Sequence, residues 1–404
     1  MDTVTQFVIG AAAGQLVGGR ALGRKAALVG GLAGWLPDAD VLIRSAADPL
    51  LAIEQHRGFT HALLFTPVGA AVVAAPFLLH RAGRAKAGAV YAAALAGWAT
   101  HAPLDACTSY GTQLLWPLSD LRVAWNVVSI VDPMITLPLI LGVVLAAWLR
   151  RAWPAAAALA VALAWIGVGA IQHARAADAQ QALADARGHQ VVRALVDPSL
   201  GNMVVWRSLY QTPDGRLHAD AIRLPLAGGP VTVRQGASTP VVGAEEIESL
   251  PAASPEAMAR AARVWFWFTD GWVGRLPGAG VVLADHRYAA DPAGLEPLWA
   301  MTLRPQDAAA PVSRSSPRLG GRGMIDLWRE VVGQDRRHVP LPAVEQRPGE
   351  TAPRAARERA DEARGSERTG PTWRRCSARR VRRRRAAAGS GAPPTRPRRG
   401  PRAG

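Results

Sequence analysis

The sequence is poor in cysteine and in aromatic residues, and the shortage of cysteine excludes two kinds of protein. Only Cys107 and Cys376 occur among 404 residues, which excludes a disulfide framework and any zinc module built from pairs of cysteines. Aromatic residues make up 6% of the chain although 49% of it is hydrophobic, since Ala, Val and Leu supply much of the apolar content. The N-terminus, MDTVTQFVIG, lacks the basic start of a cleavable signal, so we expect the first helix to be retained.

Acidic residues are missing from residues 374–404, where twelve arginines dominate the formal charge of +16. Subtracting those twelve leaves only +4 for the rest of the chain. Such a tail can bind nucleic-acid phosphates, but the topology derived below places it outside the cytoplasm, so we do not expect a nucleic-acid partner. From residue 307 onward the chain is rich in Pro, Arg, Ala and Gly. This composition predicts a disordered basic tail over 307–404, apart from an amphipathic turn at MIDLWREVVG.

Apolar segments of helix length fill the first 175 residues. Four of them, at 59–79, 87–106, 130–149 and 154–172, come near the ~20 residues that cross a bilayer. Two shorter Gly/Ala-rich helices are expected before them, at 3–19 and 26–43. Their small residues would allow close packing, either as a helix pair or as a re-entrant hairpin. The sequence thus predicts a multi-span helical membrane domain over residues 1–176.

Positive charge is divided unevenly between the connecting loops. The loops of one side hold Arg20, Arg24, Lys25, Arg81, Arg84, Lys86, Arg150 and Arg151, whereas those of the other side hold only Arg44, Arg57 and Arg122. The positive-inside rule places the basic loops in the cytoplasm, in a multi-pass protein of the bacterial inner membrane. Everything after residue 172 then lies on the outer face.

Residues 177–306 have a different character. The runs NMVVWRSLY, LHADAIRL and GVVLADHRY predict strands, and PEAMARAARVWFWF predicts a helix. The expected fold class is therefore mainly α: a multi-span helical membrane domain, then a small α+β soluble domain, then a disordered basic tail.

Three histidines and four aspartates gather at one face of the membrane in this scheme. LPDADVL ends the second helix, HRGFTH opens the next, HAPLD closes the fourth and IVDP opens the fifth. These seven residues are Asp38, Asp40, His56, His61, His101, Asp105 and Asp132, and Arg57 of HRGFTH lies among them. Ionisable side chains at the edge of hydrocarbon are costly and mark functional sites. Imidazoles and carboxylates without thiolates fit zinc, or else manganese or iron, with one or two ions.

Each residue also has a simpler explanation. Asp132 precedes Pro133 and would make a good helix N-cap. Asp38 and Asp40 could end a helix at the interface, or one of them could act as a general base. Asp40 could instead orient a ligating histidine. Arg57 could reach toward lipid headgroups or bind a phosphate or carboxylate. The segment CTSYGTQLLWPLSD is either an ordinary tight loop or a lid or wall beside the metals.

The order of LPDADVL, HRGFTHALL, HAPLDACTSYGTQLLWPLSD and IVDPMITLPLI resembles the YdjM-like family of inner-membrane proteins, which are regarded as metal-dependent hydrolases. The resemblance covers about residues 1–175 and continues more weakly through LADHRY and PLWAMTL. The family is thought to be distantly similar to zinc-dependent phospholipase C and P1 nuclease. By motif, the resemblance implies that the ligands are Asp38, His56, His61, His101 and Asp105, with Asp40 and Asp132 as further candidates. Ala62 stands where family members often have serine.

The expected function is that of a membrane-bound metal-dependent hydrolase acting on a phosphoester or another anionic lipid or envelope substrate at the membrane surface. The predicted metal ligands are Asp38, His56, His61, His101, Asp105 and Asp132. Asp40 and Arg57 have the predicted catalytic roles, as general base and as holder of the substrate's anionic group. Membrane lipids and a small-molecule or lipid-linked substrate are the expected partners. The alternative is a non-enzymatic membrane protein that senses metal or binds a partner.

Overall fold

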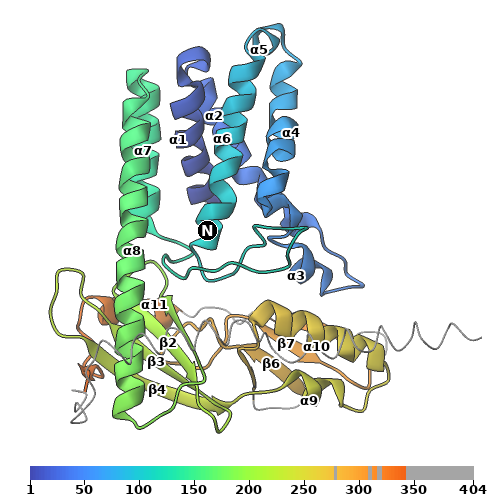
Figure 1. Ribbon diagram of the computed structural model, residues 1–404, viewed down its shortest axis with the longest axis vertical. Coiled ribbons are helices and arrows are strands. Elements are labelled where there is room, and N and C mark those ends of the chain that lie inside the picture. The colour runs from blue at the N-terminus through green and yellow to red at the C-terminus, as the bar shows by residue number, and fades with distance from the viewer. Residues whose placement is uncertain (277–279, 308–311, 316–320, 343–404) are drawn as a thin grey trace, which may run out of the picture. The chain divides into compact units, whose positions relative to one another are not determined.

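The computed structural model describes residues 1–342, apart from 277–279, 308–311 and 316–320. These described residues form one compact unit. Its N-terminal part is helical and its C-terminal part is rich in strands, which agrees with the expected order of a helical region and an α+β region (Figure 1).

The helical part consists of long α-helices, joined by short turns at one end and by longer connections, residues 36–65 and 107–132, at the other. The long helices are α1 (Thr3–Leu22), α2 (Lys25–Trp35), α4 (Thr66–Leu78), α6 (Ala87–Ala106), α7 (Pro133–Leu149) and α8 (Trp153–Ala186). The short elements are η1 (Leu36–Leu42), α3 (Leu51–Gln55), η2 (Phe59–His61), η3 (Leu63–Phe65) and α5 (Arg81–Arg84). The second expected helix is shorter than predicted, since Pro37 removes a backbone donor and residues 36–42 continue as a 3₁₀ turn.

Helices α1 and α2 pack at very short range through glycines four residues apart. A Cβ atom on Gly30 would lie 2.3 Å from the carbonyl oxygen of Gly10, and one on Gly34 would lie 2.5 Å from that of Gln6. The same close approach occurs at Gly14. The predicted close pairing of the two small-residue helices is confirmed.

The apolar run from Phe59 to Leu79 does not form one helix, contrary to the prediction. Ala62 is extended, and the segments on either side of it, 51–61 and 63–78, are bent by 58°. The backbone N–H of Leu63 donates instead to the carbonyl of Leu114, at 3.0 Å, so the break is tied to the neighbouring loop. The break positions His61 at the end of a turn rather than inside a span.

Length and composition support fewer spans than the sequence suggested. Among the described residues, α8 is the helix that by itself is long and apolar enough to cross a membrane. The bent pair would add a second span, and α7 is apolar but only 17 residues long. The four predicted spans are therefore not confirmed.

The basic loops nevertheless converge at the end of the helices remote from the sheets, as Figure 1 shows for α5. Arg24 Nε donates to the carbonyl of Ala147 at 2.9 Å, in the last turn of α7, and Lys86 Nζ donates to the carbonyl of Ala21. The connections with few basic residues lie at the opposite helix ends, where the site is found.

The strands form two antiparallel sheets. One has the order β1 (Arg193–Pro198), β2 (Val205–Gln211), β3 (Arg216–Arg223), β4 (Thr232–Pro240), β9 (Val339–Pro340), and the other β5 (Val273–Arg275), β6 (Val281–Asp285), β7 (Ala300–Leu303), β8 (Val312–Ser315). The helices of this part are α9 (Ala244–Glu248), α10 (Pro255–Thr269) and α11 (Gly321–Val331). The three expected strand runs correspond to β2, β3 and β6, and the expected helix to α10.

The fold continues past residue 306, where the composition predicted disorder apart from the amphipathic turn at MIDLWREVVG, most of which forms α11. Strand β9 pairs with β4, with Val339 opposite Val233. Glu330 of α11 is buried against Arg234, at 3.0 Å. This pairing joins residues far apart in the sequence, so composition could not reveal it. The rest of the predicted tail, residues 343–404, lies outside the described residues.

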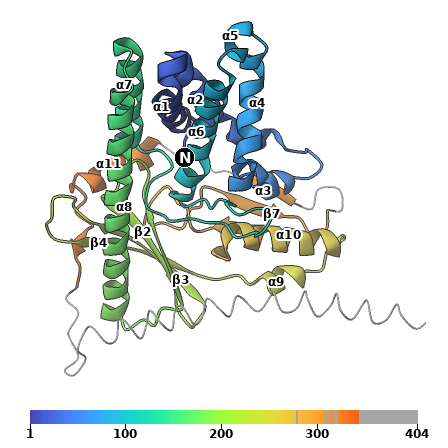
Figure 2. The ribbon, with the colours of Figure 1, turned by 45° about the horizontal axis from the view of Figure 1, so that its top comes forward.

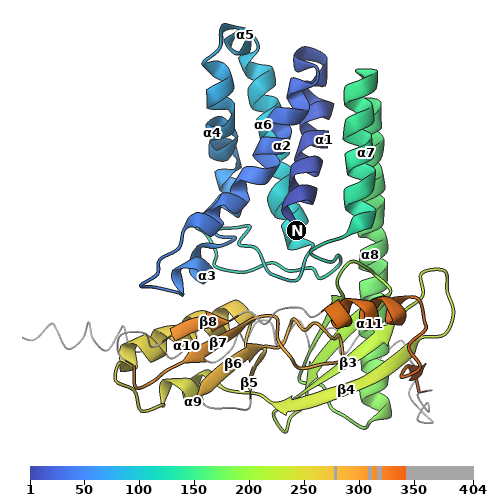
Figure 3. The ribbon, with the colours of Figure 1, turned by 180° about the vertical axis from the view of Figure 1, so that it is seen from behind.

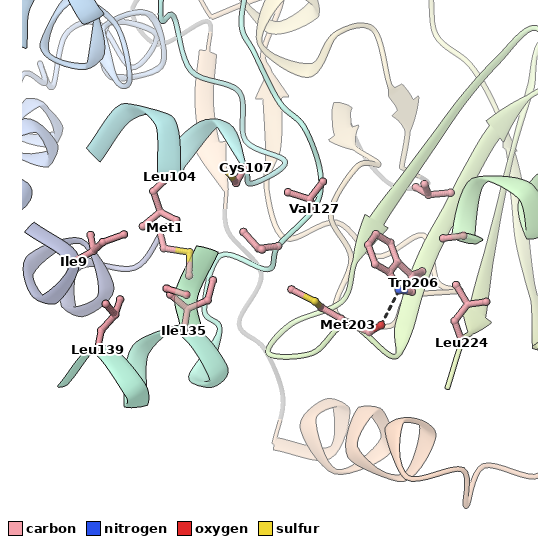
Figure 4. Close-up of a cluster of buried hydrophobic side chains, with 14 of the residues drawn as sticks. Met1, Ile9, Leu104, Cys107, Val127, Ile135, Leu139, Met203, Trp206 and Leu224 are labelled. Carbon is pink, nitrogen blue, oxygen red and sulfur yellow. Dashed lines mark hydrogen bonds between the residues drawn. The ribbon is translucent and has the colours of Figure 1, made fainter. Parts of the chain in front are cut away.

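Helix α8 joins the two parts without interruption, so the predicted boundary at residue 176 falls inside a helix. Figure 2 shows its C-terminal half beside β2 and β3. Gln172 Nε2 donates to the carbonyls of Met203 and Leu224, and Gln180 Nε2 donates to Ser208 Oγ. One core cluster extends from the helices into the sheet, including Met1, Ile9, Leu104, Ile135, Met203 and Trp206 (Figure 4).

Candidate metal centre

Three short segments bring four of the predicted ligands together. Asp38 comes from η1, His61 ends η2, and His101 and Asp105 lie in the last turns of α6. Their ligand atoms all lie within 4.8 Å of one another. The two histidines and Asp105 are buried, whereas the Asp38 side chain is 18% exposed and so is the open side of the group.

The local sequence explains this geometry. Residues four apart on a helix share a face, and α6 continues through Pro103 to Ala106, so His101 and Asp105 point the same way. The His101 Nε2 and Asp105 Oδ2 atoms are 3.7 Å apart. The 3₁₀ turn after α2 then carries Asp38 to 3.4 Å from the same nitrogen.

Hydrogen bonding fixes how both imidazoles face the centre. His101 Nδ1 lies 2.6 Å from the carbonyl oxygen of Gly34, which only accepts, so this nitrogen must carry the proton. Thr60 Oγ1 donates to Asp40 at 3.0 Å and therefore accepts from His61 Nδ1 at 2.9 Å. In neutral imidazoles the two Nε2 atoms, which face each other at 2.9 Å, would therefore be the unprotonated ones.

Two opposed lone pairs at this distance repel unless they share a proton or bind the same metal ion. His61 Nε2 is also 3.3 Å from Asp105 Oδ2 and 3.6 Å from Asp38 Oδ1, which adds two carboxylates to the same space. Neutral imidazoles and carboxylates at such spacing, each histidine oriented through its other nitrogen, form a donor set suited to a divalent metal. These four residues therefore fit a metal ion.

Asp40 and His56 lie beside this group rather than in it. His56 Nδ1 donates to Asp40 Oδ1 at 2.7 Å, and the backbone N–H of Arg57 and Thr60 Oγ1 both donate to Oδ2. Burial acts to raise the pKa of the Asp40 carboxyl, but hydrogen bonds from His56 and His61 outweigh it and hold the pKa below its usual value. Asp40 is thus an ionised carboxylate that accepts hydrogen bonds from the HRGFTH turn. This agrees with one of its predicted alternatives, that of orienting a histidine.

Arg57 is held in a strained conformation against the centre. Its φ angle is +60°, in the left-handed region that a residue with a side chain seldom adopts. Its Nε lies 3.0 Å from Asp105 Oδ2, its guanidinium donates to Thr108 Oγ1, and it stacks over the Tyr110 ring at 4.6 Å. Arg57 is therefore directed into the protein and not toward solvent.

The loop 107–129 forms a wall of the site, which favours the second interpretation of CTSYGTQLLWPLSD. The backbone N–H of Gln113 donates to the carbonyl of Arg57 at 3.1 Å, and the Tyr110 ring lies 5.2 Å from that of His56. Arg122, from the return of the same loop, donates to the carbonyl of Tyr110 at 2.6 Å.

Asp132 does not join the four residues. Its carboxylate accepts from the backbone N–H of Met134 at 3.0 Å and from Trp165 Nε1 at 3.0 Å, as an N-cap of α7. Asp132 therefore has the N-cap role that was one of its two predicted alternatives, since α7 begins with Pro133. Among the six predicted ligands, the structure leaves His56 and Asp132 outside the group.

Several contacts of the site were not predicted. Thr60 and the Gly34 carbonyl set the two histidine orientations, while Gln6 Nε2 donates to Asp105 Oδ1 at 2.8 Å and the Met1 ammonium contacts the same atom. Thr60 lies within the quoted HRGFTH motif, so its hydroxyl was a usable signal. The Gly34 carbonyl and Gln6 come from other helices, and no local pattern marks them.

A pocket of about 360 Å³ opens onto the centre, lined by Asp38, His56 and Arg57 together with apolar Trp35, Val41 and Leu42. An adjoining groove of about 290 Å³ runs between α1 and α2, along Val4, Phe7 and Leu32. Thr3 and Trp35 line both. A polar pocket beside the metal group thus continues into an apolar groove.

The helical region has a helix long and apolar enough to cross a membrane and a His/Asp group that could hold a metal, which is compatible with a metal-binding membrane protein. Comparison with known families also indicates a membrane protein and names one family. Residues 1–176 match the family described as YdjM inner membrane protein, the family that the motifs predicted. The description of that family names the inner membrane. Neither a curated protein nor a solved structure matches the chain, so the similarity to P1 nuclease has no support here.

Proposed function

We propose that this chain is a membrane-bound, metal-dependent hydrolase whose substrate is an anionic phosphoester with an apolar tail. The observation that carries the proposal is the pair of Nε2 atoms of His61 and His101, facing each other at 2.9 Å beside two carboxylates. Asp38, His61, His101 and Asp105 would hold the ion, with zinc as the first choice. A divalent ion in that place supplies Lewis acidity toward a phosphoryl oxygen and lowers the pKa of water.

The protein's own residues supply the remaining chemistry. His56 lines the pocket and donates through Nδ1 to Asp40, so its Nε2 is available to accept a proton from an attacking water. A base oriented by a carboxylate is a recurring arrangement in hydrolases. This assigns the general base to His56 and makes Asp40 its positioning residue, instead of the base that the sequence suggested. Arg57 contributes positive charge at the pocket wall, where an anionic group would enter.

The apolar groove between α1 and α2 supports a lipid-like substrate. An anionic headgroup at Asp38, His56 and Arg57 leaves its tail beside Trp35, at the entrance to the groove. A phospholipid that carries a photoactivatable acyl chain should cross-link to α1 near Phe7. Competition by long-chain phosphoesters, but not by glycerol phosphate, is the expected result, and equal competition by both would refute the lipid assignment.

Metal content is the first test of the hydrolase proposal. Mass spectrometry on the detergent-purified full chain should find one or two equivalents of zinc or manganese, lost in His61→Ala and in His101→Ala. His80→Ala, at the far helix ends, is the matched control and should retain the metal. No metal in the wild type, even after reconstitution, would overturn the proposal. Metal without hydrolysis of any phosphoester would favour the alternative of a metal-binding sensor.

We also propose several membrane spans and an outward-facing soluble part. The convergence of the basic loops at one helix end supports this orientation. A periplasmic reporter fused after residue 344 should be active, whereas the same reporter inserted at 82 should be inactive. The reverse result would invert the topology.

A further inference from the structure

Helix α11 exposes a continuous apolar face that nothing in the described part of the chain covers. Met324, Ile325, Trp328 and Val332 are 47%, 56%, 65% and 42% exposed. Met324 and Trp328 are four residues apart and so lie along one side of the helix, with Ile325 next to them. Val332 directly follows the helix, and its N–H donates to the carbonyl of Trp328 at 3.0 Å. Four large apolar side chains gathered on one short helix differ from the scattered exposed residues of ordinary surfaces.

The opposite side of α11 is firmly attached, so the exposure does not come from a loosely placed helix. Leu327 packs with Val205 and Ala221 of the sheet. Glu330 pairs with Arg234. Arg223 Nε, at the end of β3, donates to the carbonyls of Glu330 and Val331 at 3.1 and 3.3 Å. The sheet therefore determines which way the apolar face points.

The sheet edge that carries α11 lies at the level where the apolar helices end. Leu224, the residue after β3, accepts from Gln172 of α8, directly after the exposed apolar segment that ends near Ile171. The turn between β1 and β2 reaches the start of α7, with the N–H of Gly201 donating to Ser129 Oγ at 3.0 Å. Figures 1 and 3 show α11 beside α8 at the boundary between the helices and the sheets.

We propose that α11 is an interfacial anchor that inserts Met324, Ile325, Trp328 and Val332 into the headgroup layer of the membrane that α8 crosses. An amphipathic helix parallel to the bilayer, with tryptophan on its apolar face, binds membrane surfaces in this way. Its charged residues Arg329 and Asp326 remain exposed at the side, where they meet water and headgroups. The anchor would fix the sheet against the bilayer independently of the metal centre.

Spin labels at Trp328→Cys and Asp326→Cys test the anchor directly. Both variants are made in the full chain with Cys376→Ser, so that the new cysteine is labelled selectively. Cys107 is buried, and the Cys376→Ser protein without a further change measures any background labelling. In nanodiscs of phosphatidylethanolamine and phosphatidylglycerol, the ratio of oxygen to nickel-chelate collisions should be several-fold higher at 328 than at 326. Ile325→Cys, on the same apolar face, should repeat the result if the loss of Trp328 disturbs folding.

Two results would overturn the anchor. Equal nickel accessibility at 325, 326 and 328 would show that the face is in water. Protection of 328 only in nanodiscs that hold two copies of the chain, and not in those that hold one, would show that a second copy covers the face. Metal content in the same samples reports on the proposed function separately, so failure of one proposal does not imply failure of the other.

Discussion

At the scale of single residues, the site depends on groups that position the histidines as much as on the ligands. His61 owes its orientation to Thr60, whose hydroxyl donates to Asp40 and accepts from the ring. His101 owes its orientation to the carbonyl of Gly34. Each acceptor fixes a tautomer and so leaves an Nε2 lone pair directed at the centre.

Replacement of the threonine hydroxyl should weaken metal binding without removing a ligand. In Thr60→Val, His61 Nδ1 loses its nearest acceptor, and the affinity for zinc should fall about 10- to 100-fold. Competition with a chromophoric chelator measures the change. Thr100→Val is the control, because that hydroxyl donates to Gly97 within its own helix. Equal affinities in the two variants would show that Thr60 does not position the ring.

Asp197 of β1 predicts how stability depends on pH. Burial raises the pKa of this carboxyl to about 7, although Ser109 and the charge of Arg287 act against the shift. The unfolded chain releases this proton near pH 4 and the folded chain only near pH 7, so the free energy of unfolding falls as pH rises through that window.

Asp197→Asn should therefore be nearly neutral near pH 4 and stabilising at pH 8. The gain is on the order of 4 kcal/mol at most, at about 1.4 kcal/mol for each pKa unit. Thermal unfolding in detergent across this pH range measures it, with exposed Asp214→Asn as the control. A difference from wild type that does not change with pH would contradict the raised pKa.

At the scale of elements, the α1–α2 pair is set by backbone contact, which small side chains permit. Alanine at Gly30 would place its Cβ 2.3 Å from the Gly10 carbonyl, so the helices must separate. We expect Gly30→Ala to lower the free energy of unfolding by about 1–3 kcal/mol. Gly167→Ala in α8, where a Cβ meets nothing within 4 Å, should be neutral or slightly stabilising. Unfolding temperatures of the two variants decide, and equal values would exclude tight packing as the reason for glycine.

The elements also show what the sequence could and could not predict. Periodicity located the long helices, and the i, i+4 spacing of His101 and Asp105 predicted a shared face. Apolar composition alone could not reveal the break at Ala62, which depends on a hydrogen bond to Leu114, far along the chain. Asp132 matched both a ligand and a cap, and only its contacts with Met134 and Trp165 separate the two roles.

At the scale of the whole molecule, the site loop and the sheet-rich part are joined through Arg122. Its guanidinium donates to the carbonyl of Phe268 at 2.9 Å and stacks over the rings of Tyr110 and Trp267. Arg260 makes a second connection, to Asp48 and Glu54, but that pair is much more accessible to water.

Arg122→Ala should destabilise the protein by about 2 kcal/mol, since a charged donor and its stacking contacts are lost together. Hydrogen exchange should rise in residues 107–129. Arg260→Ala, which removes a pair screened by solvent, should cost less than ~1 kcal/mol and leave that loop protected. Similar exchange in the two variants would mean that Arg122 does not couple the loop to the sheet.

Helix α8 couples the sheet mechanically to the region where the chain is proposed to cross the membrane. Its 34 residues extend about 51 Å, and Gln172 and Gln180 fasten its last turns to the sheet. Helix α8 passes from one part to the other without a break, and about 22 Å of it lies beyond Gln172. A tilt of ~10° in the bilayer would therefore displace the C-terminal end of α8 by roughly 4 Å. Bilayer thickness alters helix tilt. If α8 spans the bilayer as proposed, a change in its tilt therefore moves the sheet directly, in addition to any movement passed on by the contacts of Arg122 and Arg260.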